Sequence, residues 1–259
     1  MIVAILVVDI GNTSVTAGVY RNGNISRLER MPTGKASREA ILGLVRKVAA
    51  RSRLTGAMVA SVVPRVDGVW KSALRECVAG PVAFVRHTLK LGVAVRYPEP
   101  ETIGADRLAN AAGGIARYGA PLIVADFGTA VTFDIITKRG YEGGIIAPGL
   151  PLVFDYLAEK TAKLPRLHEL PARGAWGRST EQAMQLGARW GFPGLVQGIL
   201  TELQKQPALK KAQVVITGGH GNVVRKALGK SAVVDSTLTL YGIGLIFELN
   251  YGKHNENAD

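Results

Sequence analysis

Ile5-Leu-Val-Val-Asp-Ile-Gly-Asn-Thr13 and Leu122-Ile-Val-Ala-Asp-Phe-Gly-Thr129 are the two stretches that decide the fold of this chain. Each is an apolar run that ends in Asp-x-Gly and is followed closely by a threonine. Such a run, bounded by glycine, predicts a buried strand, which places Asp9 and Asp126 at strand ends. The glycine lets backbone approach a ligand, and the threonine hydroxyl with nearby N–H groups can bind phosphate oxygens. The recurrence predicts a duplicated domain whose two phosphate loops face one cleft.

The composition narrows the class of protein. A chain of 259 residues with 47% hydrophobic residues can form one large domain or two modest ones. The single cysteine, Cys77, excludes an internal disulfide and a cysteine-cluster zinc site. Asp9 and Asn12 follow the apolar start at once, which predicts a first strand and not a signal peptide. No apolar run approaches the roughly 18 residues that a membrane span needs, so we expect a cytoplasmic protein with no membrane partner.

The positive charge is partly concentrated in one stretch. The chain has a formal charge of +12, and Arg27 to Arg53 holds eight basic and two acidic residues. Residues 37–53 carry apolar side chains at helical spacing, which predicts a helix with a solvated basic face. Such a surface would also attract anionic small molecules such as nucleotides. No aromatic residue interleaves the basic stretch, which argues against nucleic acid as its partner.

The same order of elements recurs in the two halves. Alternating residues 15–20 and an Asn22-Gly23 turn predict a hairpin in the first half, and a helix follows over 37–53. In the second half residues 131–136 alternate, a turn follows around 138–140, and a helix is expected over 152–162. Each half adds a further strand, at 57–63 and at 213–217. Strands alternating with helices predict an α/β fold with a mixed sheet.

The chain is expected to divide near its middle. A helix begins near Gly104-Ala-Asp-Arg107 and carries small residues that allow close helix packing. We expect this helix to end the N-terminal domain, residues 1–117, and the second domain, residues 118–259, to open near Pro121. The C-terminal helix is expected to pack back on the first domain.

The ordered set of motifs resembles the type III pantothenate kinases, within the superfamily of sugar kinases, heat-shock chaperones and actin. The resemblance covers nearly the whole chain, and its ordered set is far more specific than any single motif. It is carried by Asp9-Ile-Gly-Asn-Thr13, Ser61-Val-Val-Pro64, Tyr97-Pro98, Gly104-Ala-Asp-Arg107, Asp126-Phe-Gly-Thr-Ala130, Gly143-Gly-Ile-Ile-Ala-Pro-Gly149, Thr161-Ala-Lys-Leu-Pro165, Gly177-Arg-Ser-Thr180, Thr217-Gly-Gly219 and Leu238-Thr-Leu-Tyr-Gly242. It implies two duplicated ribonuclease H-like domains, each with a mixed five-stranded sheet, and an interdomain cleft.

The resemblance also implies roles for single residues. Asp106 is implied to be the general base, Asp126 the ligand of a monovalent cation (K⁺ or NH₄⁺), and Asp9 a ligand of Mg²⁺, directly or through water. ATP binding is implied for Asp9, Ile10, Gly11, Asn12, Thr13, Ser14, Val15, Thr16 and Thr129. Substrate binding is implied for Tyr97, Gly104, Ala105, Asp106, Arg107 and Thr180.

The residues taken alone leave plainer alternatives open. Asp9 or Asp126 could cap its own loop, although a pair of such carboxylates beside phosphates favours a cation, since hard cations take oxygen ligands. Asp106 could be a first-turn aspartate favoured by the helix dipole. Arg107 could belong to a structural ion pair, and Thr180 to a helix cap. Thr217-Gly-Gly219 could cradle a nucleotide or form a tight strand-to-helix turn.

The expected function is therefore that of a type III pantothenate kinase. Such an enzyme transfers the γ-phosphoryl group of ATP to the 4′-hydroxyl of pantothenate, the first step of coenzyme A biosynthesis. The chain lacks a Walker Gly-x4-Gly-Lys-Ser/Thr run, which excludes a P-loop kinase. The alternatives are a non-enzymatic regulatory accessory factor of the same family and another kinase of the superfamily. The resemblance also implies a homodimer.

Overall fold

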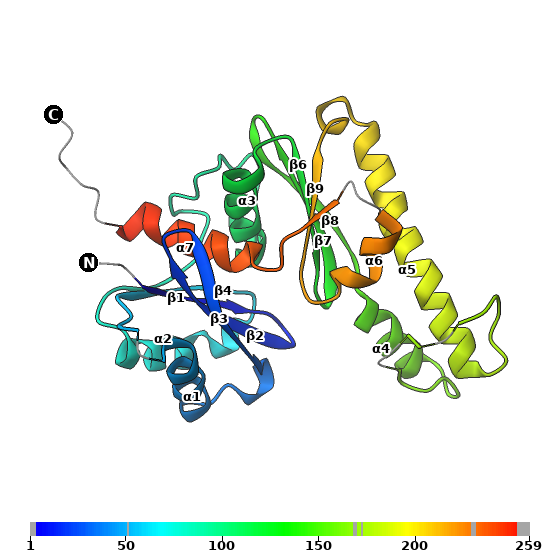
Figure 1. Cartoon of the computed structure of the whole chain (residues 1–259), viewed down its shortest axis with the longest axis horizontal. Helices are drawn as coiled ribbons and strands as arrows, with labels where there is room; N and C mark the ends of the chain where they lie inside the picture. The colour runs from blue at the N-terminus through cyan, green and yellow to red at the C-terminus, as the bar shows by residue number, and fades with distance from the viewer. Residues whose placement is uncertain (1–3, 51, 168–169, 172, 229–231, 253–259) are drawn as a thin grey trace. The chain divides into compact units, whose positions relative to one another are not determined.

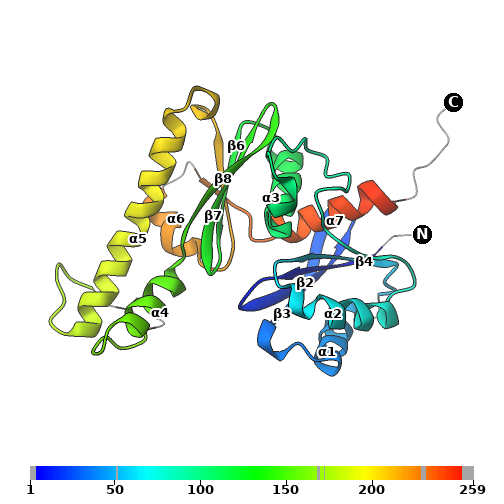
Figure 2. The ribbon, with the colours of Figure 1, turned by 180° about the vertical axis from the view of Figure 1, so that it is seen from behind.

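The computed structural model describes residues 4–50, 52–167, 170–171, 173–228 and 232–252. They form two compact units. Unit 1 comprises Met1–Gly119, Arg139–Glu142 and Thr237–Asp259, and unit 2 comprises Ala120–Lys138 and Gly143–Ser236. Figures 1 and 2 show each unit as a sheet with helices against it. No helix among the described residues is long and apolar enough to cross a membrane.

Unit 1 is built on a five-stranded mixed sheet in the order β3-β2-β1-β4-β5. β1 lies at its centre, antiparallel to β2 and parallel to β4. The strands are β1 (Ile5–Ile10), β2 (Ser14–Arg21), β3 (Asn24–Pro32), β4 (Gly56–Ser61) and β5 (Val82–Phe84). The helices of this unit are α1 (Arg38–Ala49), α2 (Pro64–Cys77), α3 (Ala105–Tyr118) and α7 (Leu238–Tyr251), with short 3₁₀ turns η1 (Thr33–Lys35) and η2 (Pro100–Thr102).

The alternation of β1 explains how the unit 1 sheet is covered. Leu6, Val8 and Ile10 lie in one apolar cluster with buried residues of α1 and α2, including Trp70. The opposite face, which includes Ile5, is covered by α7, which contacts β1, β2 and β4. α7 also packs along α3, where a Cβ on Gly242 would lie only 1.9 Å from the Ala109 carbonyl oxygen. This close approach needs the small residues that the α3 sequence supplies.

Unit 2 repeats the sheet with the order β10-β9-β6-β7-β8. β6 is antiparallel to β7 and parallel to β9, as β1 is to β2 and β4. The strands are β6 (Leu122–Phe127), β7 (Ala130–Thr137), β8 (Gly140–Pro148), β9 (Gln213–Thr217) and β10 (Ala232–Val234). The first three residues of β8, which include Tyr141, belong to unit 1. The helices are α4 (Leu150–Lys160), α5 (Thr180–Lys205) and α6 (Gly221–Leu228), with the 3₁₀ turn η3 (Pro207–Leu209). The two mixed five-stranded sheets confirm the predicted fold class.

The local predictions differ from the structure mainly at element ends. The basic helix is α1, capped by the Ser37 side chain, and its buried residues are the four apolar ones predicted from the spacing, Ile41, Leu44, Val45 and Val48. It ends at Ala49, and the predicted extension includes Arg51, which lies outside the described residues. The helix predicted over 152–162 begins and ends two residues earlier, as α4. The 26-residue α5 was not predicted beyond its cap at Ser179.

Candidate active site

The first phosphate loop joins β1 to β2 in unit 1. The Gly11 N–H donates to the Ser14 carbonyl oxygen over 3.1 Å, which closes the loop on itself. Thr33 ties it at both ends, because its hydroxyl donates to the Gly11 carbonyl (2.7 Å) and its N–H donates to the Thr13 carbonyl (3.0 Å). Asn12 and Thr13 remain exposed. The result is a fixed loop with an amide and a hydroxyl facing solvent, which suits phosphate oxygens.

The predicted ATP-binding residues around this loop differ in exposure. Asp9 is partly exposed and lies opposite Thr16 in the β1–β2 pair. Ser14 and Thr16 are also partly exposed, whereas Ile10 and Val15 are fully buried in the core. Ile10 and Val15 can therefore contribute to a nucleotide site through their backbone only.

Asp106 lies in the first turn of α3. Its Oδ1 accepts a hydrogen bond from the Arg107 N–H over 2.8 Å. Gly104 is the residue that caps the helix, and a Cβ there would lie 2.5 Å from Asp106 Oδ1. A side chain at position 104 would displace the carboxylate. The glycine of the Gly-Ala-Asp-Arg motif is thus a steric requirement for the observed position of the Asp106 carboxylate.

A short series of contacts links Asp106 to the sheet of unit 1. The N–H of Val62, just after β4, donates to the Ile10 carbonyl at the end of β1 over 3.1 Å. A Cβ on Gly104 would lie 3.4 Å from Val62 Cγ1. The N-terminus of α3 is therefore at the end of the sheet from which the first phosphate loop emerges. The predicted base and the predicted phosphate loop share that end of unit 1.

The environment of Asp106 favours a proton acceptor. Burial raises the pKa of the Asp106 carboxyl, and the hydrogen bond from the Arg107 N–H and the Arg107 charge oppose that rise. A raised pKa means that the carboxylate holds a proton more strongly once it has taken one. General bases are most effective when their pKa approaches the operating pH.

Arg107 belongs to a cluster that includes Tyr97 and Tyr141. The Arg107 Cζ lies 5.9 Å from the Tyr141 ring centroid, within the range of a cation–π contact. The Tyr97 and Tyr141 rings are 6.5 Å apart and tilted by 55°. Tyr141 is fully buried, whereas Tyr97 keeps 36% of its surface exposed. The cluster presents a cation and an aromatic side chain beside Asp106.

Tyr141 was missed by sequence reasoning. It follows the turn of the β7–β8 hairpin, and its backbone pairs with the segment before Tyr97. The Tyr141 N–H donates to the Ala94 carbonyl and the Arg96 N–H donates to the Tyr141 carbonyl, both over 2.8 Å. The turn itself was predicted around residues 138–140, but no local signal joins this tyrosine to a segment more than 40 positions earlier.

The second phosphate loop joins β6 to β7 in unit 2. Asp126 lies opposite Thr132 on β7 and opposite Thr217 on β9. The Gly128 N–H donates to the Ala130 carbonyl over 3.0 Å, which repeats the closure seen in the first loop. The Gly149 N–H donates to the Thr129 carbonyl over 3.1 Å. Asp126 and Thr129 are both partly exposed, so they can reach a ligand.

The Thr217-Gly-Gly219 segment packs against this second loop. Gly218 has a φ of +84°, and a Cβ there would lie 2.5 Å from Asp126 Oδ1 and 2.6 Å from the Phe127 nitrogen. The His220 N–H donates to the Phe127 carbonyl over 3.1 Å. The segment is therefore a tight strand-to-helix turn that packs against Asp126 and Phe127. A contact between this turn and a nucleotide stays a prediction.

Thr180 is not brought into this second loop by any described contact. It is exposed and is the first residue of α5. The helix begins there because the Ser179 hydroxyl accepts from the Gln182 N–H over 3.2 Å, while Gln182 Oε1 accepts from the Arg178 N–H over 3.0 Å. These two bonds cap the N-terminus of α5 in a way that resembles a capping box, with Gln182 reaching the residue before the N-cap. Thr180 and Asp106 lie in different units, so their joint role in substrate binding stays a prediction.

The donor set limits the kind of metal site that the chain can form. Among the described residues, no three His, Cys, Asp or Glu side chains gather into a metal cluster. Asp9 and Asp126 are single carboxylates at strand ends, beside loops with exposed hydroxyl groups. Mg²⁺ suits such a place, because it keeps several waters and binds one or two carboxylates together with substrate phosphates.

The family model of the type III pantothenate kinases matches residues 5–202. The chain belongs to the type III pantothenate kinase family. The match includes both phosphate loops, the Gly104–Arg107 motif and Thr180.

Two curated type III pantothenate kinases show how similar such relatives are. The protein of Methylacidiphilum infernorum is 37% identical over 246 residues, which cover 94% of this chain and 88% of the relative. The protein of Akkermansia muciniphila is 42% identical over 221 residues, which cover 85% of this chain and 88% of the relative. Both alignments span most of each protein, so the resemblance is one of whole chains.

Solved structures support the fold at much lower identity. A Campylobacter jejuni protein assigned to the Baf transcriptional activators matches with a TM-score of 0.59 at 18% identity and covers 94% of this chain and 97% of its own. A Streptomyces griseus glucokinase of the ROK family matches with a TM-score of 0.56 at 15% identity and covers 93% and 97%. At these identities the likeness is one of fold alone.

Proposed function

We propose that this chain is an ATP-dependent kinase that phosphorylates pantothenate at its 4′-hydroxyl, as the first step of coenzyme A biosynthesis. The family match supports the activity. The observation that carries the residue assignment is the N-terminus of α3. There Gly104 leaves room for the Asp106 carboxylate, burial raises the pKa of that carboxylate, and Arg107 stands beside it.

In the proposed reaction Asp106 accepts the proton of the pantothenate 4′-hydroxyl. The freed oxygen forms a bond to the γ-phosphorus of ATP, and the bond from that phosphorus to the β–γ bridging oxygen breaks, so that ADP leaves. Phosphoryl transfer depends mainly on positioning and charge stabilisation. The proposed reaction therefore needs only one proton-accepting side chain from the protein. The exposed side chains of Asn12 and Thr13 hold phosphate oxygens at the first loop.

Arg107 is proposed to bind the pantothenate carboxylate. A guanidinium matches a carboxylate in geometry and charge, and the Tyr141 ring beneath it limits its rotation. Tyr97 offers an exposed aromatic edge next to this pair. Gly104 and Ala105 contribute through their backbone, and Thr180 is retained as a substrate contact on the resemblance alone.

The cations are assigned to the two strand-end carboxylates. We assign Mg²⁺ to Asp9, directly or through water, and K⁺ or NH₄⁺ to Asp126, with Thr129 as a further contact of ATP. Bound there, the cations would neutralise phosphate charge. The Gly218 turn supports the second assignment, because it packs closely against the Asp126 carboxylate and limits where that carboxylate can lie.

A homodimer is proposed from exposed aromatic residues of unit 2. Trp176 and Trp190 keep 71% and 54% of their surface exposed, and Tyr156 on α4 keeps 62%. Large exposed aromatic side chains are enriched at protein interfaces, and a second copy of this chain is the proposed cover. Light scattering of Trp190→Lys against the parent chain tests it: a parent that is itself monomeric contradicts the proposal. We also propose that the protein is located in the cytoplasm, where ATP is available to a kinase.

The decisive experiment is release of ADP from ATP and Mg²⁺, with and without pantothenate, and with and without potassium or ammonium. ADP release that requires pantothenate supports the kinase, and stimulation by the monovalent cation supports the Asp126 assignment. A folded chain that shows no pantothenate-dependent turnover contradicts the proposal and favours the regulatory accessory role.

A further inference from the structure

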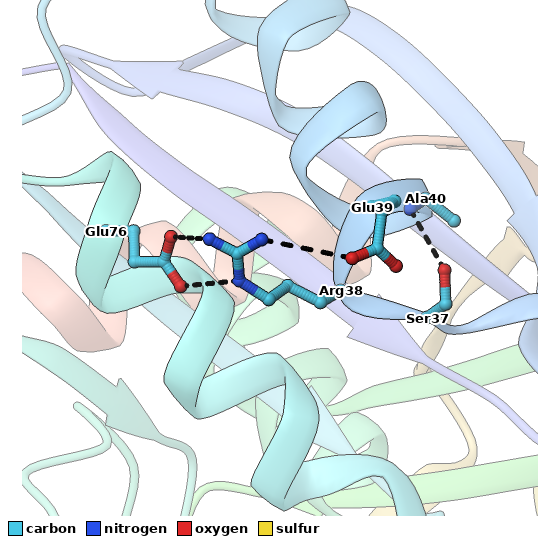
Figure 3. Close-up of polar contacts among 5 residues, drawn as sticks. All are labelled: Ser37, Arg38, Glu39, Ala40 and Glu76. Carbon is cyan, nitrogen blue, oxygen red and sulfur yellow. Dashed lines mark hydrogen bonds and ion pairs between the residues drawn. The ribbon is translucent and has the colours of Figure 1, made fainter.

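The basic stretch Arg27–Arg53 has no part in the proposed reaction, yet the structure separates Arg38 from three other arginines of the stretch. Arg38 is neutralised: its Nε and Nη2 form a two-pronged contact with Glu76 over 3.0 and 2.5 Å, and its Nη1 lies 3.9 Å from Glu39 (Figure 3). Arg27, Arg46 and Arg53 instead line two adjoining hollows, together with Arg21 from β2. The solvated helix face predicted from the sequence therefore describes only part of this stretch.

The first hollow lies in unit 1 at the β2–β3 turn. It encloses about 300 Å³, and apart from Val19 its lining consists of two arginines, two asparagines and two serines. These residues come from β2, the Asn22-Gly23 turn, β3 and Ser52 beyond α1. Every side-chain nitrogen among them is a hydrogen-bond donor, and no carboxylate lines the hollow among the described residues. This lining chemistry is that of an anion site.

The two arginines of this hollow have neutral partners only. Arg21 Nη2 donates to the Ser52 hydroxyl over a long 3.4 Å, and Arg21 Nε is buried with no hydrogen-bond partner among the described residues. Arg27 Nη1 donates to the Ala49 carbonyl over 2.7 Å. Because Arg21 Nε is covered by protein, an anion in the hollow would be bound through other N–H groups of the two arginines. Neither arginine forms an ion pair with a described carboxylate.

The backbone holds these residues in place. Asn22 and Arg27 have φ values of +48° and +55°, and the β2–β3 register shifts between Ala17 and Val19. Left-handed backbone is uncommon at residues other than glycine, and the bulge changes the direction of the strand. Arg117 donates to the Gly23 carbonyl over 3.5 Å at the turn. The hollow is therefore shaped by the defined backbone conformation of the β2–β3 hairpin.

The second hollow extends the charged surface. It encloses about 340 Å³, shares Ser52 with the first, and is lined by Arg46, Arg53 and Cys77 among others. In the part of the chain that the structure describes, none of the four arginines of the two hollows forms an ion pair. Arg38, at the start of α1, shows that an arginine of this stretch forms an ion pair where a carboxylate is close by.

We propose that the hollow of Arg21, Arg27 and Ser52 is a second anion site, which binds a small molecule through a phosphate or sulfate group. Guanidinium groups bind tetrahedral oxyanions through charge-assisted N–H bonds, and Arg21 and Arg27 both line this hollow. The site lies at the opposite end of β2 from the first phosphate loop, so it is separate from the proposed ATP site. A concave site of this size, without aromatic residues, fits a small anion and not a nucleic-acid strand.

The test uses inorganic sulfate as the probe, at constant ionic strength, on the full chain with saturating ADP and Mg²⁺ present. Calorimetry or ¹H–¹⁵N spectra should show saturable binding of sulfate. The double variant Arg21→Gln/Arg27→Gln should weaken it by about tenfold or more, since charge-assisted bonds are lost. The matched control Arg38→Gln removes the same kind of charge from the same stretch and should leave the affinity unchanged.

A second variant keeps the proposal testable if the double variant does not fold. Ser52→Asp places a carboxylate at the junction of the two hollows and should abolish sulfate binding in a protein that melts as the parent does. Binding that is not saturable, or equal weakening by Arg38→Gln, would overturn the site. An oligonucleotide that binds through Arg21 and Arg27 while sulfate does not would also overturn it. The same titration is repeated without ADP. Sulfate binding that does not depend on ADP, and that the same variants lose, would support this site even if the chain proved not to be a kinase.

Discussion

The two phosphate loops have the same closure but different neighbours. In both, a glycine N–H bonds the backbone carbonyl at the start of the next strand, Gly11 to Ser14 and Gly128 to Ala130. The first loop is one residue longer and is tied by the Thr33 hydroxyl. The second is backed by the Gly218 turn, which packs on Asp126. The two hairpins are alike but the contacts around the carboxylate differ, and the predicted base, Asp106, lies at the end of unit 1 that carries the first loop.

The largest expected effect on turnover comes from replacing the predicted general base, Asp106. Asp106→Asn keeps shape and removes the proton acceptor, so kcat should fall by about 10²–10⁴-fold while ATP still binds. Steady-state kinetics with pantothenate, beside nucleotide binding by calorimetry, measures both. Turnover that survives in the variant would remove Asp106 from the reaction.

The same variant makes a prediction about stability. Burial raises the pKa of Asp106 in the folded state above its value in the unfolded chain. The folded state then binds the proton more strongly, so this residue lowers stability as the pH rises through the interval between the two pKa values. Asp106→Asn should remove that loss, and its melting temperature should equal or exceed that of the parent at neutral pH. The measurement is the melting temperature of the variant minus that of the parent at acid and at neutral pH. A difference that is smaller at neutral pH than at acid pH contradicts the prediction.

Asp9→Asn and Asp126→Asn compare the two carboxylates directly. We expect Asp9→Asn to reduce kcat by about 10²–10³-fold, since it removes charge stabilisation next to the transferring phosphate. Asp126→Asn should reduce it less, by about tenfold, and should abolish stimulation by potassium or ammonium. Titration of each variant with Mg²⁺ and with K⁺ separates the roles. Identical ion profiles in the two variants would show that the loops are not specialised.

Gly11 in the first loop and Gly218 in the turn that packs against the second loop should differ in their tolerance of a methyl group. Gly218→Ala forces a left-handed residue against Asp126 and should cost about 3 kcal/mol of stability. Gly11→Ala meets only the Ser14 carbonyl at 3.3 Å and should cost under about 1 kcal/mol. Urea unfolding of both variants gives the comparison, and equal midpoints would contradict the packing described for Gly218.

The smallest effect concerns the Tyr141 ring. Tyr141→Leu removes the aromatic face from Arg107 and should raise the KM for pantothenate by about two- to fivefold. Tyr141→Phe retains the ring and serves as the control, with an unchanged KM. If the Leu and Phe variants behave alike, the ring does not position Arg107.

Local signals were sufficient for a large part of this fold. The hairpins, the buried face of α1 and the start of α3 each depend on residues within a few positions of one another. Trp70 has the core position that is common for tryptophan, whereas Trp176 and Trp190 are exposed and the sequence pattern could not separate the three. Most of α5 went unpredicted, because its small and polar residues show no single apolar stripe beyond the cap at Ser179.

The sequence by itself determined the two strand–Asp–Gly loops, the mixed sheets and the family, because these follow from short-range periodicity and from motifs in a fixed order. Only the tertiary structure decided that Tyr141 joins Tyr97 and Arg107, and that Gly104 must lack a side chain for Asp106 to fit. It also decided which arginines of the basic stretch are neutralised and which line a hollow. These features depend on contacts between residues far apart in the chain, and no local pattern records which distant segments will meet.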